Sequence, residues 1–190
     1  LKYALPVYYI LACAEASSNL GRYDGIRYGY QADSYRNTHD MICKTRSAGF
    51  GKEVQRRILL GTYVLSSGYY DAYYKKAQNL RGSIVRTFRE AFAHCDAILA
   101  PTVPTTSFPK GFTSQDPIVT YQTDICTVPV NICGLPAVSI PCGFDEKNLP
   151  IGMQLIGNRF AEANILNLAW QFEQATQGQF NKKVEGGLAL

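Results

Sequence analysis

Residues 96–106 read Asp-Ala-Ile-Leu-Ala-Pro-Thr-Val-Pro-Thr-Thr, and the periodicity of the chain changes at this stretch. The apolar run at 97–100 has the length of a short buried strand, and Pro101 predicts its end. A buried strand that leads into a rigid loop of prolines and threonines commonly places functional groups at the edge of a sheet. We therefore expect a sheet that begins here, with a functional edge close to it.

The chain before this stretch is predicted to be mainly helical. Apolar residues recur in steps of three and four along 4–20, 52–66 and 69–94, which is the spacing of one helix face. Asp40 is a candidate cap for a shorter helix that ends near Gly49.

The chain after this stretch is predicted to alternate between strands and helices. Residues 137–142 and 151–156 are apolar runs of strand length, and the short polar loop between them predicts an antiparallel hairpin. Pro117 is a candidate start for a short helix that ends near Asp124.

A last helix is expected over 161–176, with its inward face formed by Ile165, Leu168, Ala169 and Phe172. Helices followed by strands interleaved with helices are typical of the α/β class. Because no repeat or linker divides the pattern, residues 1–190 are predicted to belong to one domain.

Composition narrows the class of protein. With 46% hydrophobic and 18% charged residues the chain can bury a core, so an intrinsically disordered chain is excluded. No apolar run approaches the roughly 18 residues of a membrane helix, and we expect no membrane partner. The chain opens at Leu1 inside an apolar periodic segment without a capping residue, so we expect a fragment that has lost an upstream portion.

Charge and aromatic content leave two interpretations open. The net charge of +4 comes from 19 basic and 15 acidic residues that are scattered along the chain, which favours solvated helix faces over an RNA-binding block. The tyrosine-rich stretch 69–74 could stack on RNA bases, but helical spacing points its rings in several directions and favours packing.

The six cysteines include no C-x-x-C pair, and the two histidines are far apart in sequence. Cys126, Cys133 and Cys142 could approach one another, yet zinc sites normally carry short ligand pairs. We expect buried, reduced thiols rather than disulfides or a metal site, and we assign no metal ligand.

The sequence contains no complete active site by motif. Neither serine pair, Ser17-Ser18 or Ser66-Ser67, sits in a glycine-rich elbow, and Cys142 has no histidine nearby in sequence. Phosphate-binding loops and metal-binding helices are absent from the sequence as well. We therefore assign no catalytic residue to this chain.

Arg57 and Asp124 form a candidate binding pair. Arg57 lies on a predicted helix whose other face is apolar, and Asp124 precedes an apolar segment. A guanidinium can bind an α-carboxylate and a carboxylate can bind an α-ammonium, so together they could recognise a zwitterionic amino acid. The alternative is a surface arginine and a helix-terminal aspartate.

Several longer motifs resemble the A subunits of tRNA-dependent amidotransferases, within the amidase-signature family. The resemblance runs nearly end to end and is carried by residues 8–10, 15–29, 53–62, 67–77, 100–106, 127–131, 134–136 and 149–154. The motifs at 127–131 with 134–136 and at 149–154 occur across the amidase-signature family, whereas those at 8–29, 53–62 and 67–77 narrow the match to the tRNA-dependent group.

The resemblance implies a fold and an activity. The family folds as an α/β/α sandwich around a mixed central sheet, and this chain corresponds to its C-terminal portion. A lysine and two serines hydrolyse glutamine in the family. All three lie upstream of the portion represented here, so none is carried over to this sequence.

The resemblance also implies substrates, cofactors and partners. The family's glutamine-binding residues match Tyr8, Arg57 and Asp124 of this sequence. The ammonia passes to a partner subunit, where ATP and Mg²⁺ serve the conversion of Glu-tRNA(Gln) to Gln-tRNA(Gln), or the amidation of Asp-tRNA(Asn) in some species. Partners are then the B and C subunits of a heterotrimer, glutamine, and a misacylated tRNA held mainly by the partner subunit. The expected location is the cytoplasm.

Two alternatives remain at this stage. One is a fragment of a stand-alone amidase of the same fold that acts on another amide. The Arg57 and Asp124 pair argues against it, because a hydrophobic amide would leave both charges unpaired. The other is a non-catalytic module that packs against partner subunits.

We predict that the 190 residues, expressed alone, have no glutaminase activity, because they contain no nucleophile and base in a catalytic motif. The measurement is ammonia release from glutamine by the purified chain, with the heat-denatured chain as control. Release above that control would contradict the prediction.

Overall fold

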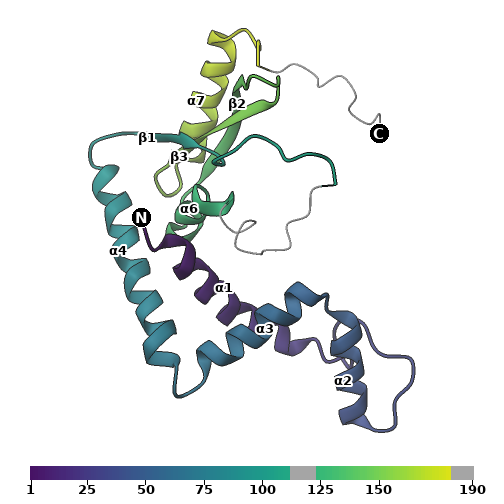
Figure 1. Ribbon diagram of the computed structural model, residues 1–190. Helices are drawn as coiled ribbons and strands as arrows, with labels where there is room; N and C mark the ends of the chain where they lie inside the picture. The colour runs from purple at the N-terminus through teal and green to yellow at the C-terminus, as the bar shows by residue number, and fades with distance from the viewer. Residues whose placement is uncertain (112–122, 181–190) are drawn as a thin grey trace. The chain divides into compact units, whose positions relative to one another are not determined.

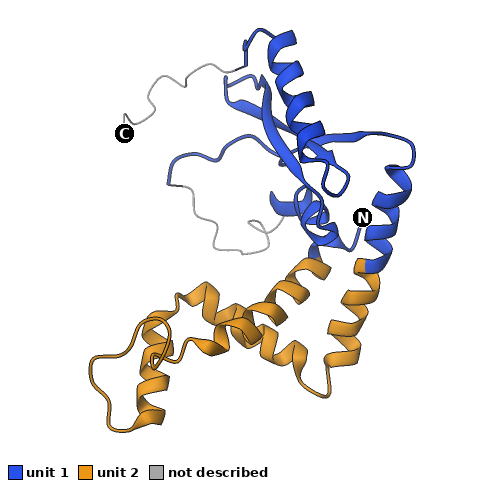
Figure 2. Cartoon of the chain, turned by 180° about the vertical axis from the view of Figure 1, so that it is seen from behind, with its two compact units in different colours: residues 1–5, 82–190 blue, residues 6–81 orange. Residues whose placement is uncertain are grey.

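The computed structural model describes residues 1–111 and 123–180 (Figure 1). The chain divides into two compact units (Figure 2). Unit 1 contains residues 1–5 and 82–190, and unit 2 contains residues 6–81.

Unit 2 is helical, as predicted. It contains most of α1 (Ala4–Asn19), then η1 (Leu20–Arg22), α2 (Thr38–Gly49), α3 (Lys52–Leu65) and η2 (Tyr70–Lys75). The predictions of helices over 4–20 and 52–66 are confirmed.

The prediction that Asp40 caps α2 is wrong by one helical turn. The cap is Asn37, whose side-chain oxygen accepts the Asp40 N–H at 2.9 Å. Asp40 lies in the first turn instead, and its carboxylate accepts the Arg36 N–H at 3.0 Å. Either residue type can cap a helix, so residue type alone does not separate them.

The predicted helix over 69–94 is divided in two. Its first part is η2, a single π-helical segment, and α4 (Lys76–Ala91) follows it. The rings of Tyr63, Tyr69 and Tyr73 pack on one another here, with Tyr63 and Tyr69 centroids 4.1 Å apart. A hydrogen bond with Tyr69 raises the pKa of Tyr63 to about 12. The rings are thus in mutual contact, as the packing interpretation predicts.

Helices α1 and α3 cross at a point where only glycine fits. A Cβ built on Gly61 would lie 1.9 Å from the Cys13 carbonyl oxygen and 2.6 Å from the Ser17 Cβ. The hydroxyls of Ser17 and Thr62 lie 2.9 Å apart beside the crossing. The absence of a side chain at residue 61 therefore lets the two backbones meet.

Unit 1 is built on a three-stranded sheet. β1 (Ala97–Pro101), β2 (Ala137–Phe144) and β3 (Pro150–Gly157) are all antiparallel, in the order β1-β3-β2. The predicted hairpin is confirmed. The resemblance implies a mixed sheet for the complete domain, and the three strands of the described residues form an antiparallel part.

β1 ends at Pro101, as the sequence predicted, and Pro101 is its last paired residue. It lies opposite Met153 of β3. β1 is an edge strand among the described residues. A proline is tolerated in an edge strand, because the N–H that it lacks would point away from the neighbouring strand.

Helix α7 (Glu162–Ala175) covers one face of the sheet. Leu155, Ile165 and Ala169 form the buried cluster there, and Val138 and Ile140 pack against it. Leu168 was predicted to face inward but is 40% exposed, so that part of the prediction is wrong. The buried residues of α7, Ile165 and Ala169, are four positions apart, and residue 168 lies beside the helix face that they form.

Unit 1 also contains two short helices, of which the second was not predicted. η3 (Thr123–Ile125) and α6 (Val128–Cys133) lie at the start of the second described range, which begins at residue 123. The helix expected from Pro117 to Asp124 lies largely outside the described residues. α6 is almost wholly buried, and the residue that follows it, Gly134, has a left-handed φ of 64°.

The β2–β3 turn is organised by one carboxylate. Asp145 accepts the N–H groups of Lys147 and Leu149 at 2.9 and 2.8 Å, and the Thr106 hydroxyl at 2.9 Å. These bonds hold the pKa of Asp145 below its ordinary value, with the Leu149 N–H as the largest cause. Thr106 belongs to the proline and threonine loop after β1, so the turn anchors that loop.

We predict that Gly61→Ala destabilises the protein by at least about 1 kcal/mol, because the added methyl overlaps the Cys13 carbonyl. The control is Gly82→Ala on α4, where the new methyl meets nothing within 4 Å. That variant should gain about 0.5 to 1 kcal/mol from helix propensity. Denaturant unfolding of both variants is the measurement, and an unchanged stability of Gly61→Ala would contradict the crossing.

We predict that the stability lost in Asp145→Asn depends on pH. The pKa of Asp145 is lowered on folding, so its stabilising effect is present above the unfolded pKa of about 3.9 and is lost as the pH falls through the folded value. Denaturant midpoints at about pH 7, 4 and 2.5 should therefore show a gap to the parent that closes with acid. Glu146→Gln makes the same charge change one residue away, and an equal gap for it would contradict the role of the turn.

Candidate functional site

The crossing of α1 and α3 places Tyr8 and Arg57 on the same pair of helices in unit 2. The Tyr8 ring meets the Tyr9 ring edge-on, with centroids 5.3 Å apart and planes at 82°. The Arg57 guanidinium carbon lies 5.5 Å from the centroid of the Tyr9 ring. Two of the three predicted substrate-binding residues are thus joined through Tyr9, a motif residue for which the sequence predicted no role.

Arg57 is oriented by a carboxylate one helical turn earlier. Its Nε donates to Glu53 Oε1 at 2.9 Å, and the second oxygen of Glu53 pairs with Arg56. The side chains are 31% exposed for Arg57 and 47% for Glu53, so solvent weakens the ion pair and its main effect is orientation. A glutamate four residues before an arginine is the spacing that could have predicted this contact.

Cys13 lies under this site as an uncharged thiol. It is 2% exposed, and burial raises the pKa of its thiol against the opposing effect of the Arg57 charge. A thiol held neutral is a poor nucleophile. Cys13 therefore contributes packing at the crossing rather than chemistry.

The prediction that the cysteines are buried is only partly right. All six thiols are free, as expected, but only Cys13 and Cys133 are buried, whereas Cys43 and Cys95 are exposed. Across residues 1–111 and 123–180 the structure brings together no group of three His, Cys, Asp or Glu side chains that could hold a metal ion.

Asp124 lies in unit 1, in the short helix η3. Its carbonyl oxygen accepts the N–H of Thr127 at 3.1 Å and the hydroxyl of the same residue at 3.2 Å. The residue is half-buried. The structure therefore places Asp124 on a hydrogen-bonded turn of unit 1, and its pairing with Arg57 around one ligand stays a prediction.

A cavity of about 570 Å³ lies beside the η3 turn. Thr123, the residue before Asp124, is part of its wall, and the rest comes from the loop after β1 and the start of β3. The sequence predicted a functional edge at that loop. The lining residues are Pro101, Val103, Pro104, Thr105, Thr106, Ser107, Phe108, Thr123, Pro150, Ile151 and Gly152.

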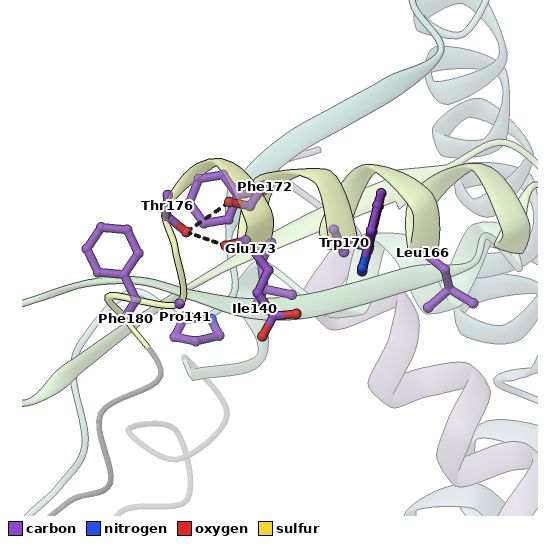
Figure 3. A pocket seen from close by; sticks show the side chains of 10 residues that line it. Ile140, Pro141, Leu166, Trp170, Phe172, Glu173, Thr176 and Phe180 are labelled. Atoms are coloured by element: carbon purple, nitrogen blue, oxygen red, sulfur yellow. Dashed lines mark hydrogen bonds between the residues drawn. The ribbon is translucent and has the colours of Figure 1, made fainter.

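A second cavity, of about 240 Å³, lies between α7 and β2 (Figure 3). Trp170, Phe172 and Phe180 supply much of its wall, and the Thr176 hydroxyl is bonded to the carbonyls of Phe172 and Glu173 at 2.8 and 3.3 Å. None of the three predicted substrate-binding residues lines this cavity. Its aromatic walls suit an apolar group better than a zwitterion.

The candidate nucleophiles of the sequence have structural contacts. The Ser17 hydroxyl pairs with Thr62, and the Ser66 hydroxyl donates to the Tyr63 carbonyl at 2.7 Å. The Cys142 thiol donates to the Ile151 carbonyl at 3.5 Å. The first contact joins α1 to α3, the second lies at the end of α3 and the third joins β2 to β3. That none of these residues is a nucleophile stays a prediction.

Comparison with known proteins defines the class of the chain. Residues 1–166 match the Amidase family model, so the chain belongs to the amidase family. Within that family it is 57% identical over 173 residues to the A subunit of glutamyl-tRNA(Gln) amidotransferase from Thiobacillus denitrificans, a match that covers 91% of this chain. It is also 57% identical over 187 residues to the same protein of Thermoanaerobacter pseudethanolicus, which covers 98% of this chain.

A solved structure agrees with these relatives. The A subunit of the glutamyl-tRNA(Gln) amidotransferase from Thermotoga maritima matches 91% of this chain with a TM-score of 0.63 and 42% identity. A structure described as an amidase matches 90% with a TM-score of 0.64 at 20% identity, which concerns the fold alone. The predicted resemblance and the α/β fold class are therefore confirmed.

The chain spans about a third of the length of these relatives. It covers 36% and 38% of the two sequences and 32% of the Thermotoga chain. In the described part of the chain no helix combines the length and the apolar character of a membrane span.

Proposed function

We propose that this chain is the C-terminal portion of the glutaminase subunit of a tRNA-dependent amidotransferase. The observation that carries the proposal is the 57% identity to the two bacterial relatives over nearly the whole chain. The complete subunit hydrolyses glutamine and supplies ammonia, which converts Glu-tRNA(Gln) to Gln-tRNA(Gln). The catalytic lysine and serines belong to the upstream portion.

The role proposed for this portion is to hold glutamine. The Arg57 guanidinium binds the α-carboxylate through two parallel N–H donors, and the Asp124 carboxylate binds the α-ammonium. Tyr8 adds a hydroxyl and an aromatic wall. Glu53 and the Tyr9 ring support this role, because they fix the Arg57 side chain before substrate arrives and so reduce the entropy lost on binding.

The remaining steps are assigned to partners. The B and C subunits complete the heterotrimer, and the partner subunit holds ATP, Mg²⁺ and most of the misacylated tRNA. The whole assembly is proposed to be cytoplasmic.

We predict that Arg57→Ala and Asp124→Ala in the complete amidotransferase lower glutamine-dependent kcat/KM by about 30-fold to several thousand-fold. Each change leaves a charged substrate group without its partner, which costs about 2 to 5 kcal/mol. Arg57→Lys should restore little, since a point charge cannot make the two-pronged contact. The measurement is tRNA amidation with glutamine and with an ammonium salt as the nitrogen donor.

The matched control is Arg56→Ala. Arg56 lies beside Arg57 on α3 and pairs with the same glutamate, yet it has no proposed contact with glutamine. Its variant should keep glutamine use, and all variants should keep ammonium-dependent amidation. Equal losses with both donors would mean that Arg57 and Asp124 hold the fold or a contact between subunits, and the proposed site would be wrong.

A further inference from the structure

Gln154 is a buried polar side chain on the central strand of the sheet. It lies on β3, is 3% exposed, and is paired across the ladder with Ala100 of β1 and Ser139 of β2. The next residue, Leu155, packs on the face covered by α7, so Gln154 points to the other face. Buried side-chain amides in folded proteins are normally hydrogen-bonded, so the partners of Gln154 show what it holds together.

The Gln154 amide joins two segments that are distant in sequence. Its Nε2 donates to the Pro101 carbonyl at the end of β1 and to the Cys126 carbonyl after η3, each at 2.9 Å. A primary amide has two N–H donors, and both are used here. The side chain therefore fastens the segment at residue 126 to the end of β1.

The Cys126 carbonyl belongs to the same turn as Asp124. Within that turn the Asp124 carbonyl accepts both the N–H and the hydroxyl of Thr127. The Thr127 carbonyl in turn accepts the backbone N–H of Asn131 at 3.2 Å and its side-chain amide at 2.9 Å. The turn is thus bonded forward to α6, and the contact with Gln154 bonds it to the sheet.

Glutamine suits this position for reasons of chemistry and length. A glutamate carboxylate accepts hydrogen bonds and would face two carbonyl oxygens, which are also acceptors. An asparagine is shorter by one methylene. A methionine has a similar length but no donor, and it would leave both carbonyls without their partner.

We propose that Gln154 is a positioning residue for Asp124, because it holds the turn that presents the Asp124 carboxylate to the α-ammonium of glutamine. The inference rests on the proposed function and adds a residue to it. Gln154 itself does not contact the substrate. It acts through the backbone of residues 124–127, whose place relative to the sheet it determines.

The test is a double-mutant cycle in the complete amidotransferase, with Gln154→Met and Asp124→Ala alone and together. Gln154→Met should raise the KM for glutamine about tenfold to a hundredfold, with a smaller effect on kcat, since a displaced binding group weakens binding. In the Asp124→Ala background the same change should have less than about a threefold effect, because its target is already absent.

A second substrate separates positioning from general loss of structure. Glutaramate is glutamine without its α-amino group, so its hydrolysis should be equally insensitive to Gln154→Met and to Asp124→Ala. Ser139→Ala is the matched control, because it removes a hydroxyl contact of 2.7 Å with Thr102 on the same face of the sheet without touching the turn. It should leave the KM for glutamine unchanged.

Should the methionine variant not fold, as judged by thermal unfolding and ammonium-dependent amidation, Gln154→Asn is taken through the same cycle. A loss of glutamine use that persists undiminished in the Asp124→Ala background, or that falls equally on glutaramate, would overturn the role of Gln154 alone. A wild-type response of Asp124→Ala itself would overturn the proposed function and this inference with it.

Discussion

Strand β3 is paired on both edges, and this constraint gives unit 1 two faces with different tasks. Side chains alternate along a strand, so Leu155 must point to one face and Gln154 to the other. The first face is apolar and is covered by α7 through Ile165 and Ala169. The second carries a polar amide whose hydrogen bonds reach the carbonyls of residues 101 and 126. The alternation of side chains along β3 therefore directs Leu155 to the packed core and Gln154 to the segments that it holds in place.

In unit 2 the corresponding constraint is a contact between backbones. Because Gly61 has no side chain, α3 approaches the carbonyl of Cys13 on α1 more closely than any other residue type would allow. The same pair of helices brings Arg57 over the Tyr9 ring. Burial keeps the Cys13 thiol neutral, so the thiol adds no negative charge that would compete with a substrate carboxylate for Arg57.

Apolar patterning predicted the long elements well: α1, α3 and α7 begin and end within about two residues of the predicted bounds. It failed where the pattern is short or the signals compete. α6 has six residues, too few for a stripe, and its burial comes from tertiary contacts. Asn37 and Asp40 are both capping types, and only the backbone path decides between them.

The candidate site was predictable to the extent that charge alone identifies it. Arg57 and Asp124 follow from the chemistry of a zwitterion, and Tyr8 follows from the resemblance. The residues that support them are of a different kind: Glu53 and Tyr9 act on Arg57, and Gln154 acts on the backbone near Asp124. These residues contact no proposed ligand. A comparison of side-chain chemistry with the groups of a substrate therefore does not identify them. The contact of Glu53 with Arg57 could have been predicted from its i,i+4 spacing. The two hydrogen bonds of Gln154 join residues 53 and 28 positions apart, so they could be identified only from the three-dimensional structure.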